Sequence, residues 1–168
     1  AQHRDPGLSA LGTEQAILAA QRLEAMNLSA PRVLASPLAR AQETAAPFAE
    51  TLSLRPQLET RISEIPAPDE ALEARAPWLR KVMAGSVAGL PPAQQAWRDA
   101  LLACLCEATV PTVFFSHFVA INLAVGAATA SSAMVSFRPG NGSITHLQTD
   151  GDRLYLVALG DEADSVVN

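Results

Sequence analysis

Apolar positions recur at helical spacing over the first part of the chain. After the turn-forming Asp-Pro-Gly of residues 5–7, this spacing predicts a helix that begins near Ser9 or Thr13 and ends at Asn27. A short apolar run, residues 32–35, predicts a strand. Ser36 and Pro37 are then typical of the N-cap and first turn of a second helix. The buried faces of the two helices are expected to hold Ala16, Ala19, Ala20 and Leu23 in the first, and Leu38, Ala41, Ala45, Phe48 and Leu52 in the second.

The second part of the chain alternates in the same way after an interruption. Residues 55–90 contain Pro56, Pro66, Pro68 and Pro77, which predict an irregular lobe with one or two helices. A helix over residues 91–108 is expected to bury Trp97, Leu101, Cys104 and Leu105. The apolar run 110–115 is typical of a strand buried on both faces, and a helix follows it. The last segment, 142–159, predicts a hairpin that turns at Asp150 and Gly151.

This alternation predicts a single α/β domain over residues 1–168, which includes the irregular lobe of residues 55–90. At 49% hydrophobic and 17% charged residues, the chain can bury the core of one such domain. Its net charge of -5 argues against a nucleic-acid or membrane partner, because both need a broad basic surface. Any anion site is therefore expected to be local. The oligomeric state stays open.

Targeting and metal signals are weak. The chain has no apolar run long enough to span a membrane and no basic-then-apolar leader, so we expect a cytoplasmic protein. Cys104 and Cys106 are expected to be reduced core cysteines, because one Cys-x-Cys pair and three histidines are little support for zinc. We predict neither a metal nor a cofactor.

Arg40 is the first candidate for chemistry. It falls in the first turn of the second predicted helix, where unpaired N–H groups and the helix dipole attract anions. A guanidinium there suits two phosphate oxygens. The alternative is an exposed arginine that pairs with Glu43.

His117 and Glu64 are the other two candidates. His117 lies where a strand gives way to a helix, and ligands of open α/β sheets bind outside the carboxyl ends of strands. It could instead be held by a backbone carbonyl at the helix start. Glu64 lies between Ile62 and Ile65, where partial burial would raise its pKa and suit it to donate a proton, although loop acids are usually solvated. His3 and His146 are weaker candidates, a chain end and an exposed strand position.

Four segments together resemble the histidine phosphatase superfamily, the phosphoglycerate-mutase-like fold: "DPGLSALGTEQA", "ASPLARAQETA", "ISEI" and "FFSHFVAIN". The resemblance implies a three-layer α/β/α sandwich whose central sheet is mostly parallel, with one antiparallel strand. It also implies a metal-free site that binds a phosphoryl group between arginines and two histidines, one of which becomes phosphorylated.

Carried over by position, the resemblance makes Arg40 a phosphate-binding residue and His117 the second histidine, which contacts phosphate and supports the transition state. Glu64 matches the acid of the family. Phe118 replaces a glycine that commonly follows this histidine. It leaves its backbone N–H available to phosphate, and we expect its ring to narrow the pocket mouth.

The sequence departs from the family at the nucleophile. The Arg-His-Gly that ends the first strand of the family is not found about twenty residues before "LSALG", and the histidine of "HRD" at residues 3–5 is too close to Leu11. We therefore expect a first strand upstream of residue 1 in a phosphatase that hydrolyses a phosphomonoester. A noncatalytic relative that binds a phosphorylated ligand, a mutase, and a structural or interaction domain stay open as alternatives. The expected partner is a small phosphorylated substrate or free phosphate.

Overall fold

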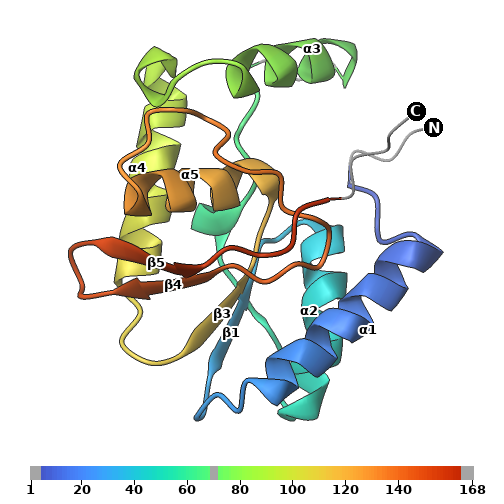
Figure 1. The fold of residues 1–168 in the computed structure, drawn as a ribbon. Coiled ribbons are helices and arrows are strands. Elements are labelled where there is room, and N and C mark those ends of the chain that lie inside the picture. The colour runs from blue at the N-terminus through green and yellow to red at the C-terminus, as the bar shows by residue number, and fades with distance from the viewer. Residues whose placement is uncertain (1–4, 69–71, 164–168) are drawn as a thin grey trace.

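The computed structural model describes residues 5–68 and 72–163. Its elements alternate as the sequence predicts (Figure 1). In chain order they are α1 (Ala10–Ala25), β1 (Arg32–Ala35), α2 (Ala39–Thr51), β2 (Gln57–Leu58), the 3₁₀ turn η1 (Thr60–Ile62), α3 (Leu72–Met83), the 3₁₀ turn η2 (Val87–Gly89), α4 (Pro92–Cys106), β3 (Thr112–Phe115), α5 (Phe118–Ala128), β4 (His146–Thr149) and β5 (Leu154–Ala158).

The central sheet has three parallel strands in the order β2-β1-β3. Leu34 pairs with Phe114 and Ala35 with Phe115, so β1 and β3 end side by side. Strands β4 and β5 form a separate antiparallel pair that turns at Gly151, whose φ of 99° favours glycine. The expected α/β class is confirmed, and the hairpin also forms where the Asp-Gly signal predicts it.

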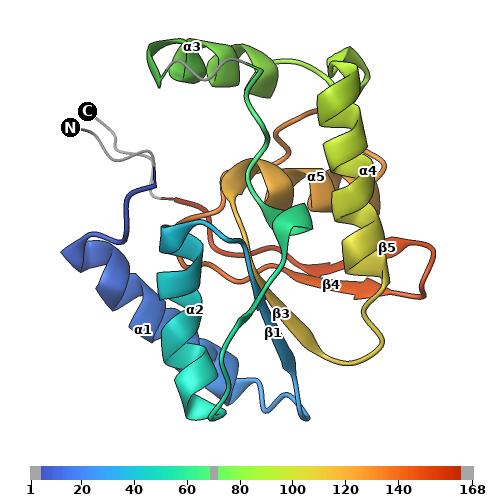
Figure 2. The same cartoon turned by 180° about the vertical axis from the view of Figure 1, so that it is seen from behind.

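Helices cover both faces of the parallel sheet, with α1 and α2 on one side and α4 and α5 on the other (Figures 1 and 2). Successive residues of β1 serve the two layers in turn, because strand side chains alternate in direction. Val33 and Ala35 pack with Phe48 and the small residues of α1 and α2, whereas Leu34 packs with residues of α4 and α5. Through the alternating directions of its side chains, the four-residue strand β1 contributes to both hydrophobic cores, one on each face of the sheet.

The start of α2 differs from the sequence prediction. The N-cap residue is Leu38, not Ser36, and the helix begins at Ala39. The Ser36 hydroxyl accepts the Leu38 N–H at 3.3 Å, while the Asp5 carboxylate accepts the Ala39 N–H at 2.9 Å. A distant carboxylate therefore supplies the cap that we expected from Ser36. Of the expected buried face, Ala41, Ala45 and Phe48 are buried, and Leu38 and Leu52 are partly buried.

Two further predictions are wrong. Pro77 does not break the lobe but lies inside α3, where Trp78, Leu79, Val82 and Met83 pack against the core and offset the cost of proline. Strand β3 is not buried on both faces: only Phe115 is buried, and Val110 lies outside the strand and is exposed. Among the residues that the structure describes, β3 pairs with β1 alone, so it is an edge strand of this sheet, and the layers on its two faces cover it only partly.

The most apolar helix is α5, which buries residues on all sides, including Val119, Ala120 and Leu123. It has 11 residues, fewer than the roughly 20 that cross a bilayer. In the described part of the chain no helix has the length and apolar character needed to cross a membrane. Helix α5 is therefore a core helix.

Substitution of Phe48 tests the packing of α2 on the sheet. Its ring is 2% exposed and contacts both α1 and β1 residues of one core. We expect Phe48→Ala to lower the free energy of unfolding by about 3–5 kcal/mol, measured by urea denaturation. Glu50→Ala, an exposed change on the same helix, should alter it by less than about 0.5 kcal/mol. Equal effects of the two variants would contradict this packing.

Candidate active site

The three residues singled out from the sequence converge at one edge of the sheet. Arg40 is the second residue of α2 and His117 is the N-cap residue of α5. Both follow strands that end together, because the Ser36 N–H donates to the Phe115 carbonyl at 3.0 Å and continues the ladder past β1. Two helix N-termini, each with a partial positive charge, therefore begin at the same edge.

Glu64 lies against the N-terminus of α5. Its carboxylate accepts the Val119 N–H at 3.5 Å and the Ile65 N–H at 3.0 Å. Burial raises the pKa of Glu64, and these hydrogen bonds and the charge of Arg40 oppose the rise. Burial has the larger effect, so the carboxyl group keeps its proton to a higher pH than an ordinary glutamate. This fits the proton-donor role expected from the sequence.

His117 is 6% exposed and its Nε2 lies 2.7 Å from the Ser36 hydroxyl oxygen. Which of the two groups donates depends on the tautomer of the imidazole, because the Ser36 hydroxyl oxygen can accept a second hydrogen bond besides the one from the Leu38 N–H. The sequence left a backbone carbonyl open as the hydrogen-bond partner of His117. In the structure its partner is the Ser36 side chain.

The charge state of His117 follows from its surroundings. Its pKa is lowered to about 4, mainly by burial and also by the charges of Arg40 and Arg75, while Asp5 opposes the shift. The imidazole is therefore neutral near pH 7 and can act as a hydrogen-bond donor without a positive charge.

Arg40 is partly exposed, and its charge acts on the pKa of both His117 and Glu64. Glu43, the partner in the alternative interpretation, instead accepts the Leu8 N–H at 2.6 Å. The arginine therefore lies at the site, in the first turn of α2, as the sequence predicts.

Phe118 is the first residue of α5, and its ring packs against the core cluster that contains Val119 and Leu123. A backbone N–H at the first helical position has no carbonyl partner within the helix, so its geometry suits an anion. The narrowing of the pocket mouth by the ring stays a prediction.

Sequence reasoning missed two residues of this site, Asp5 and Ser36 in its observed role. Asp5 bridges 34 positions to cap α2, and Ser36 bridges 81 positions to orient His117. The only sequence signals were Asp-Pro-Gly, which we took for a helix start, and Ser-Pro, which we took for a cap. Neither signal specifies a partner so far along the chain.

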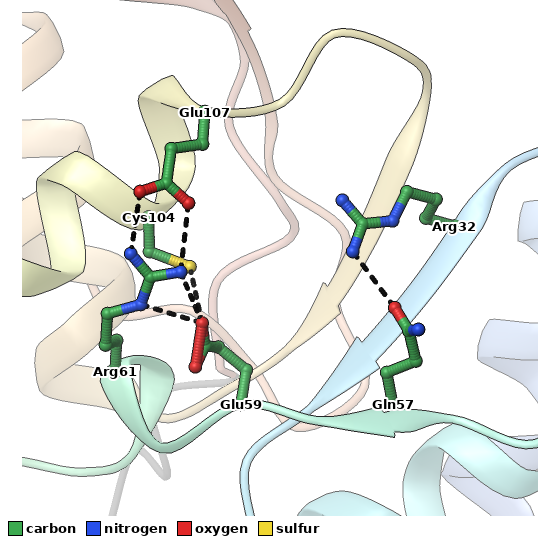
Figure 3. Close-up of polar contacts among 6 residues, drawn as sticks. All are labelled: Arg32, Gln57, Glu59, Arg61, Cys104 and Glu107. Carbon is green, nitrogen blue, oxygen red and sulfur yellow. Dashed lines mark hydrogen bonds and ion pairs between the residues drawn. The ribbon is translucent and has the colours of Figure 1, made fainter.

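A polar cluster on the η1 side of the sheet anchors the segment that carries Glu64 (Figure 3). Arg61 donates to both carboxylate oxygens of Glu107, at 2.8 and 3.0 Å, and to Glu59 at 2.7 Å. The Cys104 thiol lies 3.5 Å from the same Glu59 oxygen, and burial raises its pKa to about 11. The cluster therefore fixes η1 to the end of α4 through Arg61, which lies two residues before Ser63 in the chain.

The far side of the segment is also held. The Trp97 indole N–H donates to the Ser63 carbonyl at 3.2 Å, and the Gln94 amide donates to the Pro66 carbonyl at 2.7 Å. Both donors belong to α4. Glu64 therefore lies between two fixed carbonyls, which limits the positions that its carboxylate can take.

The remaining candidates lie outside the site. His146 begins β4 and is exposed, as predicted, and His3 is outside the described residues. Cys104 and Cys106 are free thiols, the first buried and the second partly buried. Over residues 5–68 and 72–163, no group of three or more His, Cys, Asp or Glu side chains is arranged to hold a metal ion.

These features define an α/β protein with a candidate anion site at the carboxyl ends of two parallel strands. The model of the histidine phosphatase superfamily (branch 1) matches residues 1–81, which confirms the resemblance seen in the sequence motifs. No curated protein sequence matches the chain.

Two solved structures with the same fold are phosphatases. A mycobacterial glucosyl-3-phosphoglycerate phosphatase is 24% identical with a TM-score of 0.67, and the match covers 95% of this chain and 90% of that one. The phosphoserine phosphatase of Entamoeba histolytica, in complex with 3-phosphoglyceric acid, is 21% identical with a TM-score of 0.73, covering 94% and 86%. At these identities the likeness establishes the phosphoglycerate-mutase-like fold.

Glu64→Gln tests the electrostatics of the site. Because the pKa of Glu64 is raised in the folded protein, ionisation costs stability, and the wild type loses stability as pH rises through that pKa. Glutamine cannot ionise. We therefore expect Glu64→Gln to be more stable than the wild type at pH 7, with a smaller difference at pH 4, by thermal unfolding. Glu73→Gln, on an exposed residue of α3, is the control and should show no such trend. A loss of stability at pH 7 in Glu64→Gln would contradict the buried-acid interpretation.

Proposed function

We propose that the protein is a phosphatase that hydrolyses a phosphomonoester through a phosphohistidine intermediate. The observation that carries the proposal is the meeting of two helix N-termini with Arg40, His117 and Glu64 at one sheet edge. Charge on a phosphoryl group is stabilised by fixed donors and cations, and this edge supplies both. The phosphatases with the same fold support the assignment.

In the first half of the proposed reaction, a histidine nitrogen attacks phosphorus and the ester oxygen leaves. Arg40 and the N–H groups of α2 and α5 hold the phosphoryl oxygens, and a ring N–H of His117 donates a hydrogen bond to one of them. The carboxyl group of Glu64 gives its proton to the leaving oxygen, which departs as an alcohol. Its raised pKa keeps that proton available.

In the second half, water attacks phosphorus, the P–N bond breaks, and the water proton passes to the Glu64 carboxylate. Inorganic phosphate leaves, and both the histidine and Glu64 return to their starting states. Each step is a proton or phosphoryl transfer, so the proposal involves no metal and no other cofactor.

The attacking histidine is proposed to lie on a strand upstream of residue 1, as the resemblance implies. The edge position of β3 supports this, because its second side has no strand partner among the described residues and only Phe115 of the strand is buried. We accordingly propose one domain over residues 1–168, with the lobe of residues 55–90 over the site.

A phosphatase is favoured over a mutase because the lobe is small. Its described residues form the short strand β2, one α-helix, α3, and two 3₁₀ turns, which offer little to enclose an intermediate while a substrate reorients. A cytoplasmic location completes the proposal, and the two free thiols are consistent with a reducing compartment.

The native protein should release phosphate from p-nitrophenyl phosphate at mildly acidic pH. We expect His117→Ala and Arg40→Gln each to lower kcat/KM by about 10²-fold or more, because each removes a stabilising donor for phosphoryl charge. His146→Ala, an exposed histidine on β4, is the matched control and should keep full activity. Phosphate release is followed by a colorimetric assay.

Two outcomes would redirect the assignment. Full activity of His117→Ala would remove this site from the reaction. No turnover, together with a rise in thermal stability on adding phosphate or vanadate, would favour the noncatalytic binding relative.

The role of Glu64 predicts a dependence on the leaving group. An alkoxide needs a proton more than p-nitrophenolate does, so Glu64→Gln should lower kcat/KM for an alkyl phosphate at least about tenfold more than for p-nitrophenyl phosphate. In the wild type, kcat/KM for the alkyl substrate should fall as pH rises through the pKa of Glu64. Equal losses with both substrates would exclude Glu64 as the proton donor.

A further inference from the structure

Helix α3 presents one apolar face to the rest of the molecule. Trp78, Leu79, Val82 and Met83 pack against the core cluster that includes Ile65 and Val119. Ile65 follows Glu64 in the chain, and the Val119 N–H donates to the Glu64 carboxylate. Both views place α3 beyond the carboxyl ends of β1 and β3, at the end of the molecule where α2 and α5 begin (Figures 1 and 2). The face that packs on the core is therefore also the face toward the candidate site.

Arg75 belongs to this face. It precedes Trp78 and Leu79 by three and four residues, and side chains at that spacing share one side of a helix. Unlike Trp78 and Leu79, Arg75 is exposed. The side of α3 that is apolar further along the helix therefore carries a guanidinium group in the first turn. In Figure 1 the first turn of α3 lies toward α2, and its last turn leads toward α4.

The other two basic residues of α3 point elsewhere. Arg80 follows Leu79 and Lys81 precedes Val82 by one residue, and one residue is a rotation of about 100° around a helix. Both are exposed and lie on the sides away from the packed face. A solvated helix face, the simpler interpretation of these three basic residues, thus fits Arg80 and Lys81 but not Arg75.

Electrostatics supports this placement of Arg75. The pKa of His117 is lowered mainly by burial, then by Arg40, and Arg75 also contributes. Arg75 thus acts on His117 although 42 positions separate the two residues along the chain, from 75 to 117. Its charge adds to the positive potential that Arg40 supplies at the candidate site.

We propose that Arg75 binds a second anionic group of the substrate, so that the enzyme prefers phosphomonoesters that also carry a carboxylate or a second phosphate. This inference rests on the proposed phosphatase function. The guanidinium fork matches a carboxylate or a phosphate with two parallel hydrogen bonds. Arg75 is thus a specificity-determining residue, and Arg40 serves the reacting phosphoryl group.

The test compares Arg75→Gln with the wild-type native protein on four substrates. 3-Phosphoglycerate carries a carboxylate, fructose 1,6-bisphosphate carries a second phosphate, and glycerol 3-phosphate and p-nitrophenyl phosphate carry neither. We expect Arg75→Gln to lower kcat/KM about tenfold or more for one or both of the anionic substrates. The two other substrates should change less than about twofold. Comparison of the two anionic substrates identifies the preferred group.

Matched variants come from the same helix. Arg80→Gln and Lys81→Gln remove the same charge from the other sides of α3 and should leave all four values unchanged. Arg75→Lys keeps the charge without the fork and should recover part of the loss. A purely structural role for Arg75 would lower all four values together and would overturn the proposal.

A binding measurement separates this inference from the proposed function. If no phosphomonoester is hydrolysed, the phosphatase assignment fails, but thermal shift still tests Arg75. 3-Phosphoglycerate should then raise the unfolding temperature of the wild type more than glycerol 3-phosphate does, and Arg75→Gln should abolish the difference. Turnover or binding with no preference for an anionic partner group would overturn the inference alone.

Discussion

The parallel pairing of β1 with β3 is the constraint on which the site depends. Its register aligns Ala35 with Phe115, so the two chains leave the sheet at the same level and both turn into helices there. Parallel strands have their carboxyl ends at one edge, and each following helix begins at that edge with free N–H groups. A shift of this register would move Arg40 away from His117 and separate the two N-termini.

Burial then gives the side chains at this edge their chemical character. The same core that stabilises α5 takes His117 and Glu64 out of water, which lowers the pKa of the imidazole to about 4 and raises the pKa of the carboxyl group. Both shifts disfavour charge, and both cost stability when the groups ionise. Arg40 stays partly exposed and charged. Two groups whose burial disfavours their charged forms, next to an arginine, are therefore a consequence of where the core ends.

Contacts far along the chain hold this arrangement. Asp5 caps α2 from 34 positions away, and Ser36 bonds His117 across 81 positions. The hydrogen bonds of Arg61 with Glu59 and Glu107 fix the segment that carries Glu64 to the end of α4. Each of these interactions links a loop to an element of the sheet layers, so the loop residues keep their positions without regular structure of their own.

The sequence by itself determined the elements whose signals are local. The buried face of α1, the strand at residues 32–35, the hairpin at Gly151 and the positions of Arg40 and His117 at helix starts follow from spacing and turn residues over a few positions. Tertiary structure alone decided the N-cap of α2, the place of Pro77 inside α3 and the partner of His117. Those depend on free energies of packing and capping from residues tens of positions away, which no local pattern can encode.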